Sequence, residues 1–337
     1  MEKQTSLLSK FYQNEDAARE YLETLMWPDG PVCPKCECVE GIDENGRERM
    51  HYAIEASLNK RGARKGLYKC YSCRKQFTVT VGTIFEDSKV PLHKWLLAIK
   101  LMCTSKKGVS AHQLMRNLGL GSYRTAWFMC HRVRWALGQE PIASAIGAKL
   151  EGTFEVDDVW IGGKNTPRSL KEVAERRRNP INPVDKKTPI TTVLHREGEV
   201  RSIAGHVSGE TLRPVMGEIV DISKAHIMTD SANKMKFGKH GWKHSSVDHS
   251  KKEYGRYVGG EFISTNTVES YFAIVKRSIH GIFHHVGKKY LAQYTREWDY
   301  RYNVRKMDDH ERTLKAIRSI RGKRIMLKAL KRAAVNQ

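Results

Sequence analysis

Two pairs of cysteines in the N-terminal part of the chain have the spacing of metal-binding knuckles. Cys33-Pro-Lys-Cys36 and Cys70-Tyr-Ser-Cys73 both follow the pattern C-x2-C. Each knuckle bends the backbone so that two thiolates point at one ion, and four thiolates complete the tetrahedral shell of Zn²⁺. A closed shell leaves no open position for water. We therefore expect these four residues to hold a structural zinc ion that takes no part in catalysis.

The other three cysteines give weaker signals. The chain has 7 cysteines, an odd number, and its polar N-terminus is unlike a secretion signal, which argues against a disulfide framework. Cys38 could compete as a zinc ligand, but only one residue separates it from Cys36. Cys103 and Cys130 fall in segments of helical periodicity, where we expect them to pack in the core. The alternative for both knuckles is a set of buried or redox-active thiols.

Three stretches in the second half of the chain could bring carboxylates together. Carboxylates that converge on two divalent cations roughly 4 Å apart are the arrangement that phosphodiester cleavage needs. In TFEVDDVWIGG, strand alternation places Glu155 and Asp157 on one face with Val159 and Ile161. Asp157 thus stands in a largely apolar row, where a carboxylate is costly unless it binds a cation or a partner. Asp158 and Glu155 are more easily interpreted as solvated or edge residues, and Asp157 itself could be a hydrogen-bonded strand-end residue.

The two remaining carboxylates end a strand and open a helix. Asp230 ends the apolar run AHIMTD, and strand ends of α/β sheets are where ligands collect. In NTVESYFAIVKRSIHG, a Thr265/Asn266 cap precedes a helix on which Glu269 and Lys276 lie two turns apart on one face. This spacing puts a metal-binding carboxylate in line with a phosphate-binding cation. Taken singly, Asp230 could be a turn or helix cap, and Glu269 and Lys276 could be surface residues.

An α/β unit is needed to position these three stretches. From about Leu150, the segments TFEVDDVWIGG, ITTVLHREG and VRSIAGHVSG predict three strands of a meander. TLRPVMGEIV predicts a crossover helix, and AHIMTD predicts a buried strand. The basic, proline-containing segment 164–187 predicts a solvated loop. The expected order is strand, strand, strand, helix, strand.

Ahead of this unit, the chain predicts a short helix, a small metal-bound β module and three further helices. Residues 14–25 have helical spacing after an Asn start signal, and the pieces around the second knuckle are rich in Tyr, Thr and Val, as strands are. Residues 91–139 predict three helices with a tight break before the last. That pattern is typical of a helix-turn-helix whose final, Arg-bearing helix faces DNA. A plain three-helix linker bundle is the alternative.

The charge of the chain points to an anionic partner. Lys and Arg number 59 against 37 Asp and Glu, a formal net charge of +22, and such an excess attracts phosphate backbones. Nucleic acid is the natural partner, although charge alone also fits an anionic membrane or ribosomal RNA. No window approaches the ~20 apolar residues of a membrane helix, so we expect a cytosolic protein that does not enter a membrane. The basic segment from Arg312 predicts a helical tail that contacts phosphates or is simply solvated.

The motifs together resemble a known family. VDDVWIGGK, IMTDS, WKHSSVDHSKKEY and STNTVESYFAIVKRSIHGIFHHV, followed by YTREWDYRYNVR, resemble the DDE transposases of bacterial insertion sequences that have an N-terminal zinc ribbon, the ISXO-like transposases. The resemblance extends from the first knuckle to about Lys306. It implies a multidomain protein with a zinc ribbon, a helix-turn-helix-like unit and a ribonuclease-H-like α/β catalytic domain. The implied boundaries are an N-terminal helix over 1–30, the ribbon over 31–88, the helical unit over 89–140, the catalytic domain over 150–306 and a basic tail over 307–337.

The resemblance also implies a site and an activity. Asp157, Asp230 and Glu269 would bind two Mg²⁺ or Mn²⁺ ions, and Lys276 would be the basic residue that follows the last acid. Many relatives have Asn in place of the final Glu, so the third ligand is Asn266 or Glu269, and Glu269 is favoured because a carboxylate binds a hard cation better than a neutral amide. His249 matches a position typical of the family.

The implied activity is metal-dependent cleavage at the transposon terminal repeats, followed by attack of the freed 3′-hydroxyl on target DNA. Both ends must be held at once, so a homo-oligomer on double-stranded DNA is expected, in the cytoplasm of a bacterium and associated with its nucleoid. The first alternative is a zinc-ribbon DNA-binding regulator whose nuclease-like domain is inactive. The second is a nuclease that cuts without joining strands.

Overall fold

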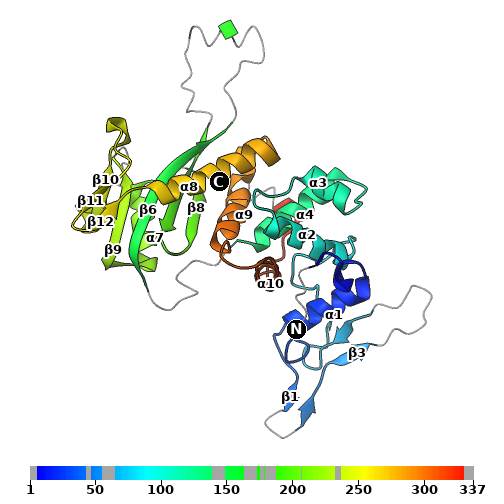
Figure 1. The fold of residues 1–337 in the computed structure, drawn as a ribbon. Coiled ribbons are helices and arrows are strands. Elements are labelled where there is room, and N and C mark those ends of the chain that lie inside the picture. Colours follow the sequence, from blue (N-terminus) through cyan, green and yellow to red (C-terminus); the bar gives the residue numbers. More distant parts are fainter. Residues whose placement is uncertain are drawn as a thin grey trace. The chain divides into compact units, whose positions relative to one another are not determined.

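The protein divides into two compact units in its computed structural model (Figure 1). Unit 1 comprises Met1–Leu137 and Met307–Lys331, and unit 2 comprises Gly138–Lys306 and Arg332–Gln337. The residues that the structure describes are 6–42, 47–54, 65–138, 149–162, 173–174, 178, 187–205, 207–231 and 237–329. The loop expected over 164–187 lies almost wholly outside the described residues.

Unit 1 begins with the predicted short helix and a set of very short strands. Asn14 caps α1 (Glu15–Met26) as its sequence predicts, because its side chain accepts a hydrogen bond from the backbone N–H of Ala17. The ribbon consists of a two-stranded and a three-stranded antiparallel sheet. The strands are β1 (Gly41–Ile42) and β2 (Glu48–Arg49), then β3 (Tyr52–Ile54), β4 (Leu67–Lys69) and β5 (Gln76–Phe77).

The three helices expected over 91–139 are present, and a fourth packs with them. They are α2 (Leu92–Thr104), α3 (Ala111–Asn117) and α4 (Tyr123–Ala136), and the fourth is α10 (Asp309–Arg318). Lys100 Nζ of α2 donates to the backbone carbonyl of Asp309 at 3.3 Å, and Ser319 Oγ donates to that of Ala136 at 3.0 Å. Ala316 and Ile317 of α10 are fully buried. The segment after 306, expected as a basic helical tail that contacts phosphates or is solvated, therefore supplies part of the helical core of unit 1 through α10.

The arginines of α4 do not all face outward, contrary to the expectation of an Arg-bearing reading face. Arg132 and Arg134 are 8% and 2% exposed. The Arg132 guanidinium donates to the carbonyl of Glu86 and lies over the ring of Phe128. Arg124, in the first turn of α4, is exposed. Helical periodicity alone does not distinguish these positions, because long Arg side chains can pack their stems in a core.

Unit 2 is built on a five-stranded mixed sheet in the order β10-β9-β6-β7-β8. Strands β6 (Leu150–Ile161), β7 (Thr188–His195) and β8 (Val200–Ala204) form an antiparallel meander, α7 (Gly209–Ile219) crosses over, and β9 (Val220–Asp230) runs parallel to β6. The predicted order of strand, strand, strand, helix, strand is thus confirmed. The fifth strand, β10 (Lys243–Val247), pairs in parallel with β9 and was not predicted, since KHSSV lacks an apolar run.

Helices cover both faces of this sheet. On one face, Phe154 and Val156 of β6 pack with Leu212 and Met216 of α7. On the other, Val159 and Ile161 pack in a larger cluster with α8 (Asn266–Ser278) and α9 (Leu291–Asn303), which lie across the sheet in Figure 1. The remaining elements are the hairpin β11 (Arg256–Val258) and β12 (Glu261–Ile263), a π turn η4 (Ile279–Phe283), and the short 3-10 turns η1 (Lys10–Tyr12), η2 (Phe237–His240), η3 (His249–Lys251) and η5 (Lys288–Tyr290).

Candidate functional site

The two knuckles of the ribbon fold as a matched pair of turns. In the first, Glu37 N donates to Cys33 O at 2.9 Å and Cys33 N donates to Cys38 O at 3.1 Å. In the second, Arg74 N donates to Cys70 O at 3.1 Å and Cys70 N to Lys75 O at 3.0 Å. Glu37 and Arg74 have φ of 57° and 60°, so the backbone of each knuckle reverses at the same position, directly after its second cysteine. This common geometry points both pairs of thiols to one place.

The four predicted ligands come together as expected. The Sγ atoms of Cys33, Cys36, Cys70 and Cys73 all lie within 4.8 Å of one another. Cys33 and Cys73 are 3.7 Å apart, and Cys36 and Cys70 are 3.6 Å apart. Zn–S bonds of 2.3 Å in a tetrahedron require sulfur atoms about 3.8 Å apart, so these residues fit a zinc ion. Cys38 lies beside this group, next to Cys36 and Cys70, whereas Cys103 and Cys130 are buried in α2 and α4, as predicted.

The three predicted acids converge at one end of the sheet of unit 2. Val156 of β6 pairs with Thr229 of β9, so Asp157 and Asp230 occupy the next position on two neighbouring parallel strands. Glu269 stands in the first turn of α8, which packs on β6. We call Asp157, Asp230 and Glu269 the acidic centre.

The electrostatics of Asp157 reflect this convergence. Burial, more than any other cause, raises the pKa of its carboxyl to about 7. The neighbouring charges of Asp158, Asp230 and Glu269 contribute to this rise, and a 2.7 Å hydrogen bond from the Asp158 backbone N–H opposes it. Among the described residues, the groups of three or more metal-ligating atoms within 4.8 Å of one another all contain cysteines. The acids are therefore spaced more widely than the thiols, as an open site would be.

Glu269 is held in place by two neighbours. Thr265 Oγ1 donates to Glu269 Oε1 at 3.0 Å, and His249 Nε2 lies 2.9 Å from the same oxygen. The side chain of Glu269 is nevertheless 42% exposed, so the carboxylate is accessible. Asn266, the other candidate for the third ligand, is the first residue of α8 and is exposed. Lys276 is exposed in the last turn of the same helix.

Glu155 joins β6 to the start of α8, and the prediction made for it from the sequence was wrong. Glu155, expected to be solvated or at an edge, is completely buried. Its carboxylate accepts hydrogen bonds from Arg196 Nε and from the backbone N–H of Val268, both at 2.8 Å. Because Val268 is the third residue of α8, Glu155 supplies the N-terminal cap that the side chain of Thr265 does not. The sequence signal that could have revealed its burial is its position two residues before Asp157, on the same face of the strand.

Arg196 extends this connection to the segment before α8. Its guanidinium donates to the carbonyls of Phe262 and Ser264 at 2.9 and 3.0 Å. Glu155 and Arg196 thus fix the start of α8 to β6, and so place Glu269 beside Asp157. Asp158 has a local role: it is exposed and accepts a 2.6 Å hydrogen bond from Thr191 Oγ1 of β7.

A second buried polar cluster ties α8 and α9 to β8. Asp299 accepts hydrogen bonds from Tyr271 Oη at 2.5 Å, from Ser202 Oγ at 2.7 Å and from Ser202 N at 2.8 Å. Burial raises the pKa of Asp299 to about 6, and the pKa of Tyr271 is raised well above its usual value for the same reason. This cluster is structural, because α9 contributes no residue to the acidic centre.

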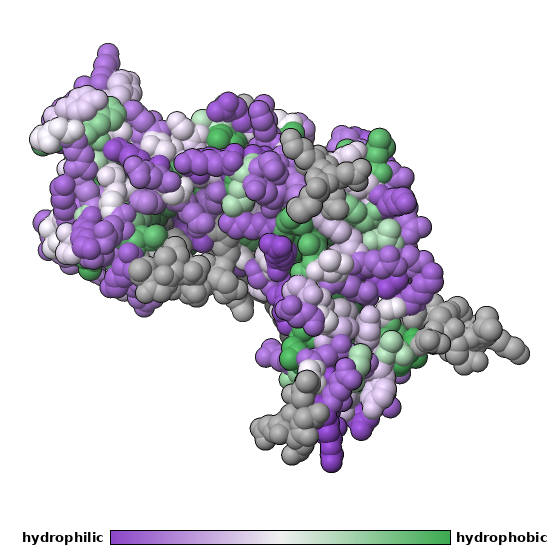
Figure 2. Space-filling view, turned by 60° about the horizontal axis from the view of Figure 1, so that its bottom comes forward, coloured by the Kyte–Doolittle hydropathy of each residue, from purple (hydrophilic) through white to green (hydrophobic). Residues whose placement is uncertain are grey.

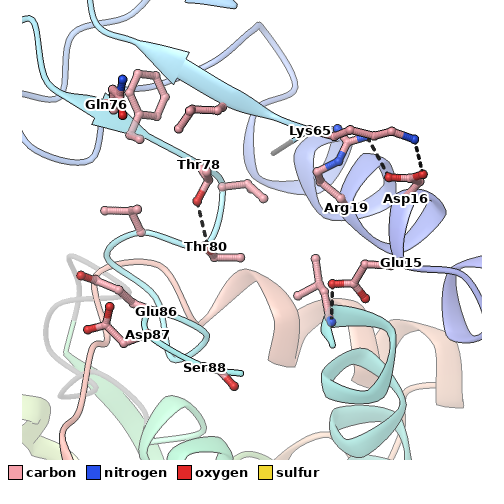
Figure 3. Close-up of a pocket in the computed structure, with 15 residues that line it drawn as sticks. Glu15, Asp16, Arg19, Lys65, Gln76, Thr78, Thr80, Glu86, Asp87 and Ser88 are labelled. Carbon is pink, nitrogen blue, oxygen red and sulfur yellow. Dashed lines mark hydrogen bonds and ion pairs between the residues drawn. The ribbon is translucent and has the colours of Figure 1, made fainter. Parts of the chain in front are cut away.

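A groove in unit 1 lies between α1, the ribbon and the loop before α2 (Figure 3). Glu15 accepts from the backbone N–H of Leu92 at 2.8 Å and so caps α2, and Lys65 donates to Asp16 at 2.5 Å. The charged lining residues are Glu15, Asp16, Arg19, Lys65, Glu86 and Asp87. Because acids outnumber bases, the groove does not suit a phosphate, and its contacts join α1 to the ribbon and α2.

On the face shown in Figure 2, the described residues are largely hydrophilic, with hydrophobic residues in small separate patches. No described helix is long and apolar enough to cross a membrane.

Comparison with known proteins identifies two domains. Residues 13–76 match the transposase zinc-ribbon domain, and residues 149–303 match the ISXO2-like transposase domain. The chain is 24% identical over 311 residues to a protein of Halobacterium salinarum described as an uncharacterized protein in transposable element ISH50, covering 88% of this chain and 93% of that protein. The two matched domains contain the sulfur ligands and the acidic centre, respectively.

Proposed function

Because the chain belongs to the ISXO2-like transposases that have an N-terminal transposase zinc ribbon, we propose that its acidic centre cleaves transposon-end DNA and joins the freed 3′-hydroxyl to target DNA. The observation that supports this most directly is the placement of Asp157 and Asp230 on adjacent parallel strands, with Glu269 facing them from α8. Three acids on three different elements converge there, and the charges of Asp230 and Glu269 both raise the pKa of Asp157.

The sheet supports a catalytic domain of the ribonuclease-H type. An antiparallel meander β6-β7-β8, extended by the parallel strands β9 and β10 on its other edge, gives the order β8-β7-β6-β9-β10. In this order β6 is central, and Asp157 within it lies beside Asp230 at the end of β9, so the two carboxylates share one site. Ligands of open α/β sheets collect at such carboxyl ends.

The residues of the acidic centre fit divalent cations such as Mg²⁺ or Mn²⁺. Hard cations prefer carboxylate oxygens, and two-ion sites need ligands spread over ions roughly 4 Å apart. When bound, two such ions would activate the attacking oxygen and stabilise the leaving oxygen at phosphorus. Asp157, between the other two acids, would be the shared ligand. No nucleophilic side chain is required.

Glu269 is the better candidate for the third ligand. Its charge already acts on Asp157, while His249 and Thr265 hold its Oε1 and leave the side chain partly exposed. We assign His249 a positioning role, since it contacts the acid directly. Lys276 lies two turns further along the same helix, where an exposed ammonium group can bind a phosphate of the DNA backbone.

Unit 1 is proposed to bind the transposon ends. The ribbon and the exposed first turn of α4, with Tyr123 and Arg124, offer the contacting groups, while the buried Arg132 and Arg134 stabilise the helical unit itself. The net charge of +22 would supply sequence-independent attraction to DNA. Holding two ends at once requires at least two protomers, so a homo-oligomer on double-stranded DNA is part of this proposal.

The test compares Asp230→Ala with Asp221→Ala, a matched control on the same strand. Asp221 is partly exposed at the start of β9 and bonds only Ser223 locally among the described residues. Purified chain is incubated with end DNA, a target plasmid and Mg²⁺. We expect nicking and strand joining by wild type and by the control, and a loss of at least ~1000-fold in Asp230→Ala, with DNA binding retained.

Two outcomes would overturn the proposal in different ways. Binding without cleavage by the wild-type chain would favour a DNA-binding regulator. Cleavage without strand joining would favour a nuclease that uses the same acids.

A further inference from the structure

A fifth sulfur lies against the four predicted zinc ligands. Cys38 Sγ is 3.2 Å from Cys36 Sγ and 3.2 Å from Cys70 Sγ. Both distances are shorter than the 3.6 Å between Cys36 and Cys70 themselves. The thiol of Cys38 therefore occupies the immediate surroundings of any ion that these residues hold.

The two knuckles have the same backbone geometry, but only the first has an additional cysteine beside its ligands. Cys33 N donates to the carbonyl of Cys38, and Cys70 N donates to that of Lys75. Cys38 and Lys75 are thus equivalent positions, five residues after the first cysteine of each knuckle. Only the first knuckle has a thiol there, and Cys36 beside it is exposed whereas Cys73 is partly buried.

A buried histidine beside Cys38 gives an independent sign of a ligand. His51 is 6% exposed, and its Nδ1 has no hydrogen-bond partner among the described residues. Its Nε2 lies 3.3 Å from the carbonyl of Cys38, and its ring stacks on Tyr71. The ligand atoms of Cys38, His51 and Cys70 all lie within 4.8 Å of one another. A buried imidazole nitrogen without a partner is unfavourable, and metal coordination would supply that partner.

We propose that Cys38 is a reserve zinc ligand that takes the place of Cys36, with His51 as a further donor of the same reserve set. In the exchange one Zn–S bond to Cys36 breaks and one to Cys38 forms. The proton of the Cys38 thiol passes to the Cys36 thiolate, so the charge of the site is unchanged. The ribbon then keeps its ion when its exposed ligand is lost. This inference rests on zinc being the metal of the ribbon.

The test measures zinc content and zinc affinity of the full chain, by elemental analysis and by competition with a chelator. We expect Cys36→Ser to keep about one zinc per chain with affinity within about tenfold of wild type, because Cys38 replaces the lost thiolate. Cys73→Ser, the equivalent change in the other knuckle, should weaken zinc binding by at least about 100-fold. Cys36→Ser combined with Cys38→Ser should be as weak as Cys73→Ser, and His51→Phe should weaken binding further in Cys36→Ser than in wild type.

If the cysteine variants fold poorly, the inference can be tested by adding a cysteine at the equivalent position of the second knuckle. Lys75→Cys adds the reserve thiol to the second knuckle, and it should restore zinc to Cys73→Ser. Cobalt substituted for zinc reports the number of thiolates by its charge-transfer absorption, so Cys36→Ser should keep the wild-type intensity. Equal zinc loss in Cys36→Ser and Cys73→Ser would overturn the reserve ligand while leaving the zinc ribbon intact. A wild-type chain without zinc would overturn the ribbon site itself.

Discussion

The sulfur ligands of unit 1 and the acidic centre of unit 2 are supported in opposite ways. The cysteines lie on turns between strands of two or three residues, and the apolar cluster around them is small, with Phe77, Trp27 and Tyr68 beside the sulfurs. Two of the acids lie on the long strands β6 and β9 and the third lies on α8, beside two apolar clusters that α7, α8 and α9 complete. We therefore expect the first site to need a bound ion in order to fold, and the second to be formed by packing before any metal binds. Zinc would stabilise the fold of the ribbon, whereas the cations of the acidic centre would bind to a fold that is already formed.

Removal of zinc gives the largest expected effect and tests the first half of this contrast. Structural zinc in small modules contributes about 10–16 kcal/mol of apparent binding free energy, which is also folding free energy. A chelator, or Cys73→Ser, should therefore unfold the ribbon. Hydrogen exchange should show loss of protection in β3, β4 and β5 with β6 and β9 unchanged. An equal loss of protection in β6 and β9 would contradict the proposed difference between the ribbon and the acidic centre.

The next effect concerns the buried ion pair that supports the acidic centre. Glu155→Ala leaves Arg196 and the N–H of Val268 without their partner, so we expect the free energy of unfolding of unit 2 to fall by about 3–5 kcal/mol. Glu151→Ala on the same strand removes a pair with Lys224 whose side chains are 53% and 57% exposed, so it should leave the free energy of unfolding nearly unchanged. Denaturant unfolding of both variants measures the difference. Similar values for the two would mean that α8 is held by packing alone.

A pH-dependent effect of intermediate size is expected at Asp299. Its folded pKa of about 6 lies above the usual value of 3.8, so the folded state binds the proton more tightly than the unfolded chain. The stability that the protonated carboxyl contributes is present at low pH and is lost as the pH rises from about 4 to about 6. The unfolding free energy of wild type minus that of Asp299→Asn should therefore fall by ~2–3 kcal/mol between pH 4 and pH 7.5. A difference that stays constant with pH would contradict the raised pKa.

The smallest loss of stability is expected at the acidic centre itself. Without metal, Asp157→Asn removes a carboxylate that burial and neighbouring acids disfavour, so it should leave the melting temperature unchanged or raise it, most of all at a pH where the wild-type carboxyl is charged. Mg²⁺ or Mn²⁺ should raise the melting temperature of wild type and not that of the variant. A strongly destabilised Asp157→Asn would mean that this acid is structural, as the cysteines are.

The sequence predicted these two sites unequally well. The knuckles are local, because two residues fix each turn, and so spacing alone identified Cys33, Cys36, Cys70 and Cys73. The order of strands from β6 to β9 followed from alternation and apolar runs. The convergence of Asp157, Asp230 and Glu269 needed the family resemblance, since an isolated acid at a strand end has many other uses.

Long-range partners account for what the sequence did not predict. Glu155 has the composition of a surface residue, and only the N-terminus of α8, more than a hundred residues later, makes its burial favourable. The inward-facing Arg132 of α4 depends likewise on Glu86 and Phe128. Strand β10 forms because β9 offers it a free edge, and its own residues carry little strand signal.

The return of the chain to unit 1 has a consequence for how the protein is made. α10 buries Ala316 and Ile317 with the helices of unit 1, and Lys100 of α2 bonds to the backbone at Asp309. A ribosome finishes α2 some two hundred residues before it supplies α10. During synthesis, the helices of unit 1 therefore lack the packing of α10 until unit 2 has been synthesised. A nascent or truncated chain that ends before Met307 would have its acidic centre complete while its N-terminal unit still lacks a helix.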